Sequence, residues 1–509
     1  MRILKKLKRN KTNRTDEKQA ERQESREEYP PTENLNDFFS YYLKNFSDTQ
    51  DLKKQSLFLG NRKALVIYIE TLIDKDKLYE KLSDMSKIEI ESQQSKNLTY
   101  ALRSLDSIKE SFNALLEGKC LLFIADEENL YEFEIRKTHD RSIEEPMNEK
   151  VVRGDHEGFI ENINTNINLI RNRIKNKNLV VRYYTLGRES QTKIAIVYHN
   201  KIVNEHILNE VERRINSIDV DLIINPGSTE ELIEDNAYSL FPQMLNTERV
   251  DRAAANIMEG RIALLSDGAP DAIILPINFF AFFQSPDEYN SRWITGSFFR
   301  ILRMISLLIA VTLPSIYISI ISFHSEIIPT ELVLTIKSSV EEIPYPPLVE
   351  ALLVELTIEI IREAGIRLPT PIGQTIGIVG GLVIGDAIVR AGLVSNVMII
   401  VVALTAVSSF VVPSYDMSNT IRLLRFPAMF FAATLGFYGM VIYFTLVVIH
   451  LCKLESFGTP YLSPISPLRF QDLKDSFFRA PLWMMKKRPK DSGARKSTRQ
   501  GGSREWKRK

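Results

Sequence analysis

The segment Ile301–Ser322 restricts the fold of this chain most, because it is long enough to cross the roughly 30 Å hydrocarbon core of a bilayer. Only Arg303 and Pro314 interrupt it, and proline is tolerated inside membrane helices. Three further apolar segments follow, at 371–393, 397–412 and 428–452. The pattern predicts an all-α polytopic membrane domain over residues 296–453, with four crossings.

A fifth helical segment, 346–365, is predicted between the first two crossings and carries acidic residues. At 100° per residue, Glu355, Glu359 and Glu363 fall within about 80° of one another and form one stripe. A lipid-facing row of carboxylates would be costly, so the stripe must face water, protein or a pore. Two interpretations remain open: an amphipathic helix lying in the interface, or a pore or vestibule lining that favours cations.

The segment after the acidic helix contains a glycine at every fourth position: Gly373, Gly377, Gly381 and Gly385. Such spacing lets helix backbones approach closely, either around a central axis or within one subunit. Asp386 and Arg390 follow as an i,i+4 pair. We expect this intramembrane charge pair to satisfy itself near the interface, with a direct role in ion passage as the alternative.

Residues 37–295 read as a soluble α/β region, because short apolar runs of strand length alternate with helical patterns. The pattern predicts two subdomains, 37–150 and 151–295, that meet near 141–155. Predicted strands are 64–69, 120–124, 128–136, 179–184, 193–198, 219–224, 261–265 and 272–276; predicted helices are 74–85, 159–174, 205–215 and 247–259, the last with Thr247 as N-cap.

The sequence offers no evidence for enzyme chemistry. It contains no Walker loop, no G-x-S-x-G, no H-E-x-x-H and no G-x-G-x-x-G after a strand. Two cysteines and six scattered histidines do not make a metal site. A net charge of +1 excludes nucleic-acid binding through overall charge. We therefore expect no catalytic residues, cofactor or metal; the loop 153–158 (RGDHEG) is interpreted as a turn with Asp155 as a helix cap, or else as a functional loop.

Both ends of the chain are polar. Residues 1–36 form a basic and polar tail without the apolar run of a signal peptide, and we expect them to be disordered. The tail 454–509 is strongly basic, which places it in the cytosol by the positive-inside rule. With both termini cytosolic the number of crossings must be even, which four crossings and a non-spanning acidic helix satisfy.

From about residue 57 to 468 the chain resembles the A subunit family of GerA-type bacterial spore germinant receptors. The matching strings are SIEEP (142–146), VVRGDHEGF (151–159), Thr165-Asn166, Leu169-Ile170-Arg171, ELIEDN (231–236), FPQ (241–243), TER (247–249), EGR (259–261), FFQSP (282–286), IPTEL (328–332), RLPTPIGQTIGIVG (367–380), RLLRFP (422–427) and SFGTPYLSP (456–464). Where the family usually has Pro-Arg, this chain has Asp155-His156, which puts any family role of that loop in doubt.

The resemblance implies an integral protein of the spore inner membrane that contacts lipid. It further implies a transporter-like B subunit and a lipoprotein C subunit as partners. Family members are thought to form a homo-oligomer that acts as a nutrient-gated cation channel and starts germination. Two alternatives stay open from the residues themselves, a non-conducting scaffold or signalling subunit and a secondary transporter.

Overall fold

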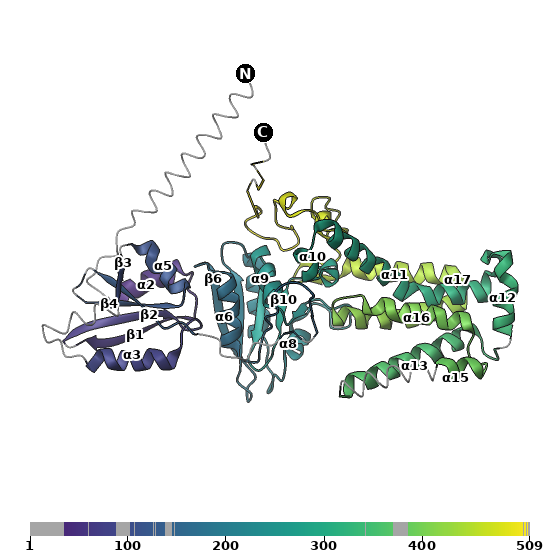
Figure 1. The fold of residues 1–509 in the computed structure, drawn as a ribbon, viewed down its shortest axis with the longest axis horizontal. Coiled ribbons are helices and arrows are strands. Elements are labelled where there is room, and N and C mark those ends of the chain that lie inside the picture. Colours follow the sequence, from purple (N-terminus) through teal and green to yellow (C-terminus); the bar gives the residue numbers. More distant parts are fainter. Residues whose placement is uncertain are drawn as a thin grey trace, which may run out of the picture.

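The computed structural model describes residues 35–59, 61–87, 102–105, 107–125, 127, 129–137, 145–146, 148–341, 343–369, 385–501, 503–504 and 506. The molecule is elongated. Two α/β units lie one after the other, and a helical bundle extends from the second (Figure 1). We call the bundle end next to the α/β units the near end and the opposite end, where α12 lies, the far end.

The first unit is a five-stranded antiparallel sheet with strand order β1-β2-β4-β5-β3. Its elements are α2 (Leu35–Asn45), β1 (Leu52–Leu59), β2 (Arg62–Ile69), α3 (Lys75–Lys87), β3 (Arg103–Leu105), α5 (Ile108–Leu116), β4 (Lys119–Ile124) and β5 (Leu130–Glu134). Apolar side chains are buried on both faces, against α2 and α5 on one and against α3 on the other. The strands predicted at 64–69, 120–124 and 128–136 and the helix at 74–85 are confirmed within a few residues.

The second unit repeats this plan with strand order β6-β7-β9-β10-β8, again antiparallel. Its elements are α6 (Ile163–Arg173), β6 (Leu179–Leu186), β7 (Thr192–His199), α7 (Glu205–Asn216), α8 (Pro226–Ile233), β8 (Leu245–Thr247), α9 (Val250–Glu259), β9 (Ile262–Ser266) and β10 (Ala272–Leu275). The predicted strands that became β6, β7, β9 and β10 are confirmed.

Three local predictions in this unit are wrong. Residues 219–224 form no strand: their carbonyls accept hydrogen bonds from the turn at 188–190, and Leu222 and Ile224 are exposed. Thr247 does not cap a helix, because it pairs with Ala272 in the sheet and α9 begins only after Arg249. Asp155 is no cap either; the side chain of Asn162 caps α6.

A buried ion pair joins the two units. Arg171 on α6 donates to both carboxylate oxygens of Asp51, at 2.6 and 2.7 Å, and both side chains are almost fully buried. Thr49 and Thr71 donate further hydrogen bonds to the same carboxylate. Arg171, one of the family-like positions, therefore fastens the first unit to the second.

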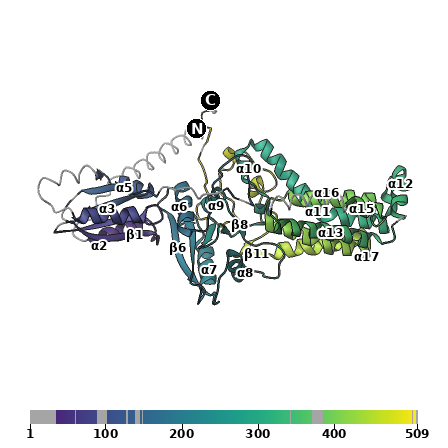
Figure 2. The same ribbon diagram turned by 60° about the horizontal axis from the view of Figure 1, so that its bottom comes forward.

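The bundle follows a short connection made of η1 (Phe279–Phe283) and α10 (Pro286–Asn290). Its helices are α11 (Trp293–Phe323), α12 (Thr330–Glu341), α13 (Pro347–Arg367), α15 (Gly385–Arg390), α16 (Asn396–Phe410) and α17 (Tyr415–Lys453), with η2 (Ser325–Ile327) after α11. Figures 1 and 2 show α11, α13, α16 and α17 side by side. By length and composition, α11 and α17 are the two described helices that could cross a membrane, and α16 is a shorter apolar helix.

Helix α17 folds back on itself at Gly436, where φ is 57° and ψ is −138°, a conformation favourable only for glycine. The Tyr443 hydroxyl donates to the carbonyl of Leu424 at 2.8 Å, which a straight helix would place about 28 Å away. We call residues 415–435 and 437–453 the outgoing and returning arms. The single crossing predicted at 428–452 is therefore wrong; hydropathy missed the turn because it is as apolar as the arms and packs against Phe323 and His324.

The acidic helix α13 runs along the bundle. Near its start, Glu350 accepts hydrogen bonds from the backbone and hydroxyl of Ser395 at the far end of α16, at 2.6 and 2.5 Å. Near its end, the Arg362 guanidinium lies 5.4 Å from the ring centre of Phe410, the last residue of α16. Most of the predicted crossing 371–393, including Gly373, Gly377 and Gly381, lies outside the described residues.

The C-terminal tail packs back onto the second unit. It contains β11 (Glu455–Ser456), β12 (Thr459–Pro460), η4 (Asp472–Asp475) and η5 (Leu482–Met484). Tyr461 donates to the carbonyl of Pro242 at 2.7 Å, and Asp491 forms a buried ion pair with Arg261 at 3.0 Å. The tail thus ties the returning arm of α17 to the α/β region.

Candidate functional site

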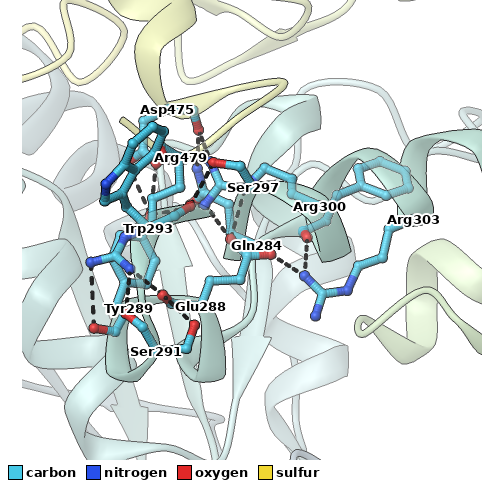
Figure 3. A network of polar contacts seen from close by, with 12 residues as sticks. Gln284, Glu288, Tyr289, Ser291, Trp293, Ser297, Arg300, Arg303, Asp475 and Arg479 are labelled. Carbon is cyan, nitrogen blue, oxygen red and sulfur yellow. Dashed lines mark hydrogen bonds and ion pairs between the residues drawn. The ribbon is translucent and has the colours of Figure 1, made fainter. Parts of the chain in front are cut away.

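A buried polar network lies where the second unit, the first bundle helix and the tail meet (Figure 3). Its centre is Glu288 on α10, which is almost fully buried. Arg300 on α11 donates through Nε to Glu288 Oε2 at 2.7 Å, and Arg303 contacts the other carboxylate oxygen. Two arginines of α11, one helical turn apart, are therefore fixed to α10 through one carboxylate.

The tail enters the same network. Arg300 donates to the Asp475 side chain at 2.8 Å and to its carbonyl at 2.5 Å. Arg479 donates to the carbonyls of Glu288 and Ser291, and Ser297 on α11 donates to the carbonyl of Arg479 at 2.9 Å. We call Glu288, Arg300, Arg303, Asp475 and Arg479 the junction network; it connects segments almost 190 residues apart in the sequence.

Tyr289 completes the junction as a neutral donor. Its hydroxyl donates to Asp475 at 2.9 Å. Burial, reinforced by the Asp475 charge, raises the pKa of Tyr289 well above its usual range. The phenol therefore keeps its proton and its hydrogen bond at physiological pH.

A second charge cluster lies inside the bundle, between α13 and the outgoing arm of α17. Arg425 forms ion pairs with Glu355 at 2.9 Å and with Glu359 at 2.6 Å. Glu355 and Arg425 are almost fully buried, whereas Glu359 keeps partial exposure. Arg422 approaches Glu359 at 3.8 Å. We call these four residues the bundle cluster.

The sequence-predicted site residues thus separate into groups. Glu355 and Glu359 face arginines of the same chain, and Glu363 is exposed and paired with Arg367 at 2.6 Å. The Asp386 side chain lies outside the described residues, so its pairing with Arg390 stays a prediction. Gly385 begins the short helix α15.

The arginines of both clusters escaped the sequence prediction, although a signal existed for those of the bundle cluster. Arg422 and Arg425 stand three positions apart in the string RLLRFP, beside an apolar segment. Charged residues in a bundle need partners of opposite sign, and the glutamates at 355 and 359 offered a matching i,i+4 spacing. The junction had no such signal, because Asp475 in the tail lies 175 residues from Arg300 in the sequence.

Acidic side chains gather where the second unit meets the start of α17. Glu230 on α8 accepts a hydrogen bond from Asn246 at 3.0 Å. Burial, with the charges of Asp416, Glu234 and Asp271 nearby, raises the pKa of Glu230 to about 7. Burial likewise raises the pKa of Asp271 to about 6. Among the described residues, no three His, Cys, Asp or Glu side chains are arranged to hold a metal ion.

The raised pKa of Glu230 should make its contribution to stability fall as the pH rises. Because folding raises the pKa of Glu230 above its usual 4.5, the folded protein binds the proton more tightly than the unfolded chain between about pH 4.5 and 7. The contribution of Glu230 to stability is then greatest below about pH 4.5 and decreases up to about pH 7. We expect Glu230→Gln to raise the unfolding midpoint in detergent at pH 8 and to leave it nearly unchanged at pH 5. Exposed Glu231→Gln is the control; an equal effect at both pH values would contradict the prediction.

Comparison with known proteins gives the family. A family model described as Bacillus/Clostridium GerA spore germination protein matches residues 40–491. The chain belongs to the GerA family. Spore germination protein A1 of Bacillus subtilis (strain 168) is 39% identical over 464 residues, covering 90% of this chain and 96% of that protein. The uncharacterized membrane protein YfkQ of the same strain is 40% identical over 376 residues, covering 74% and 73%.

A solved structure also matches. The crystal structure of the N-terminal domain of the A subunit of the Bacillus megaterium spore germinant receptor GerK3 covers 49% of this chain and 96% of that domain, at 25% identity and a TM-score of 0.38. The resemblance inferred from the strings above is confirmed. The GerA family membership supports a role in spore germination, and the apolar helices together with the membrane-protein relative support membrane association.

Several GerA-like strings hold the fold together. Arg249, in TER, pairs with Asp251 at 2.8 Å and donates to the carbonyl of Asp155 in the loop 151–158 at 2.8 Å. The two residues that differ from the usual Pro-Arg of the family also form ion pairs. Asp155 pairs with Arg173 at 2.5 Å, and His156 pairs with Glu145 at 2.8 Å. This loop is anchored on the surface of the second unit.

Proposed function

We propose that this chain is the A subunit of a nutrient germinant receptor, and that copies of it assemble into a germinant-gated cation channel in the spore inner membrane. Membership of the GerA family over residues 40–491 carries the proposal. The channel needs no catalytic site and no cofactor.

The bundle supports a transport role because it keeps ionisable side chains along its length. Charged groups at membrane depth are costly and mark ion pathways or essential pairs. From the far end to the near end, α13 carries Glu350, Glu355, Glu359 and Glu363. In one subunit the first two are buried, so Glu359 and Glu363, which are ion-paired but keep 29% and 60% exposure, are the ones that would face a shared axis.

Topology follows from the directions of the helices. In this proposal α11 and the outgoing arm of α17 run from cytosol to far side, and α13, α16 and the returning arm run back. The tail returns to the α/β region, so both lie on the cytosolic side, as the basic residues of the tail predict. The exposed apolar side chains of the arms face lipid or another copy.

The partners come from the same family relationship. A transporter-like B subunit would hold the nutrient, and a lipoprotein C subunit would complete the receptor. The α/β units and the junction network would carry the assembly and coupling contacts on the cytosolic side.

A non-conducting scaffold is the second candidate, and one observation favours it. Arg422 and Arg425 neutralise Glu355 and Glu359 inside a single subunit, which leaves less negative charge for a cation pathway.

The deciding measurement is potassium release from spores after addition of a mixture of amino acids, sugars and nucleosides. We expect deletion of the chain to abolish the release that depends on this receptor. We expect the Glu359→Gln, Glu363→Gln double variant to reduce its rate several-fold, because the ring of carboxylates that attracts cations is lost.

Glu231→Gln is the matched control, because it also neutralises an exposed glutamate, on α8; all variants are compared at equal protein abundance. Unchanged release in the double variant would move the pore away from α13 and favour the scaffold. Unchanged release in the deletion strain, with this receptor alone present in the parent strain, would contradict the receptor assignment.

A further inference from the structure

The loop 236–241, between α8 and β8, rests on the near end of the bundle and contacts both arms of α17. The carbonyl of Leu240 accepts a hydrogen bond from Thr420 on the outgoing arm at 2.6 Å. Ser239 is hydrogen-bonded to His450 on the returning arm at 2.9 Å. Phe241 is buried, with its ring 6.0 Å from that of His450. The loop is thus fixed at one level along the bundle.

That level is the boundary between polar and apolar surface. On the outgoing arm, Tyr415 is exposed at the first position, and the exposed aliphatic and phenylalanine side chains begin at Leu423, one turn beyond Thr420. On the returning arm they end at Ile449, next to His450. The loop therefore lies where the apolar band of the arms gives way to the α/β region.

The loop presents two apolar side chains that touch little of the protein. Tyr238 is 99% exposed and Leu240 is 51% exposed. The backbone that carries them is held: the Tyr238 amide donates to Asn236 at 3.2 Å, and Gln243 closes the loop with hydrogen bonds to the backbone of Asn236 at 2.8 and 3.0 Å. These hydrogen bonds fix the backbone at Tyr238, so its exposed ring is held in a defined position, unlike a tyrosine on a free terminus.

We propose that Tyr238 and Leu240 insert into the headgroup region of the bilayer, so that this loop anchors the second α/β unit on the membrane surface. Tyrosine is enriched at this depth because its ring is apolar and its hydroxyl hydrogen-bonds to water and headgroups. The inference rests on the proposed membrane insertion of the bundle.

The proposed partner of the loop is the headgroup region of the bilayer, and the loop does not recognise the charge of the lipid. The charges nearest in sequence to the loop are acidic, Glu234 and Asp235, and Asp235 is paired with Arg214 at 2.6 Å, while the exposed Lys453 lies at the end of α17. The loop therefore has no net attraction for anionic headgroups, and its insertion should not depend on salt or on anionic lipid.

Depth-dependent fluorescence quenching tests the proposal on the full chain. In a background where Trp293, Trp483 and Trp506 are replaced by phenylalanine, Tyr238→Trp supplies the only tryptophan. The protein is reconstituted into vesicles of phosphatidylcholine brominated near the carboxyl ends of its acyl chains. We expect Trp at 238 to lose about half of its emission relative to unbrominated vesicles.

Two controls use the same background. Leu446→Trp, on the lipid-facing side of the returning arm, should be quenched, and Phe58→Trp, exposed on β1 in the first unit, should not. Quenching at 446 without quenching at 238 would overturn the anchor alone. No quenching at 446 would contradict the membrane insertion on which the proposed function depends. Quenching at 238 that rises steeply with anionic lipid would overturn the uncharged mode of insertion.

Discussion

Replacement of Arg300 by alanine should destabilise the protein by about 3 kcal/mol and release the tail from α11. Removing one partner of a buried ion pair leaves the other charge uncompensated, which costs about 3–5 kcal/mol. Glu288 would keep Arg303 and Asp475 would keep Tyr289, so we expect the lower part of that range. Nutrient-triggered potassium release should be lost, because α11 would no longer be tied to α10 and the tail.

The measurement combines thermal unfolding in detergent with limited trypsin digestion. In Arg300→Ala, cleavage within 474–499 should become faster than in the parent protein. Arg292→Ala is the matched control: this arginine is exposed eight residues earlier, and surface substitutions stay within about 0.5 kcal/mol. Equal midpoints and equal cleavage in the two variants would show that the junction network contributes no stability.

Local patterns in the sequence were sufficient for most of the sheets. The strands β2, β4, β7 and β9 are short apolar runs, and such runs are buried in a sheet wherever helices cover both faces. The antiparallel pair β9 and β10 follows from the Asp267-Gly268 turn, where Gly268 takes a φ of 84°. The edge strand β1 was missed because its lysines and glutamine interrupt the apolar pattern.

Patterns failed where tertiary contacts decided the outcome. Residues 219–224 have the composition of a strand, but the neighbouring turn takes their hydrogen bonds. Hydropathy found an apolar segment at 428–452, which includes the returning arm and only the end of the outgoing arm, and missed the turn at Gly436, because apolar turns carry no polar signal. The acidic half of the bundle cluster was predictable, since the glutamates of α13 fall on one stripe, whereas their arginine partners depend on a helix 60 to 70 residues later.

The second prediction concerns Arg425, the arginine that pairs with Glu355 and Glu359. Arg425→Leu should lower stability by about 3–5 kcal/mol, because Glu355 would stay buried between α13 and α17 without a cation. Arg367→Leu is the control: it removes an exposed i,i+4 pair with Glu363, which is worth only about 0.3–0.5 kcal/mol. Unfolding midpoints in detergent at equal protein concentration measure both variants. Similar midpoints would contradict the burial of the bundle cluster.

A combined variant separates stability from conduction. Replacing a whole buried charge group by apolar side chains of similar size is often neutral, whereas removing one member is not. Glu355→Leu, Glu359→Gln and Arg425→Leu together remove the buried pair, and Arg422 keeps its contact with Asn419. We therefore expect this variant to regain stability to within about 1 kcal/mol of the parent protein. Potassium release should remain impaired, because the carboxylate at 359 is absent. If release returned along with stability, the charges of the bundle cluster would serve only to hold α13 against α17, and the scaffold would become the better account of this subunit.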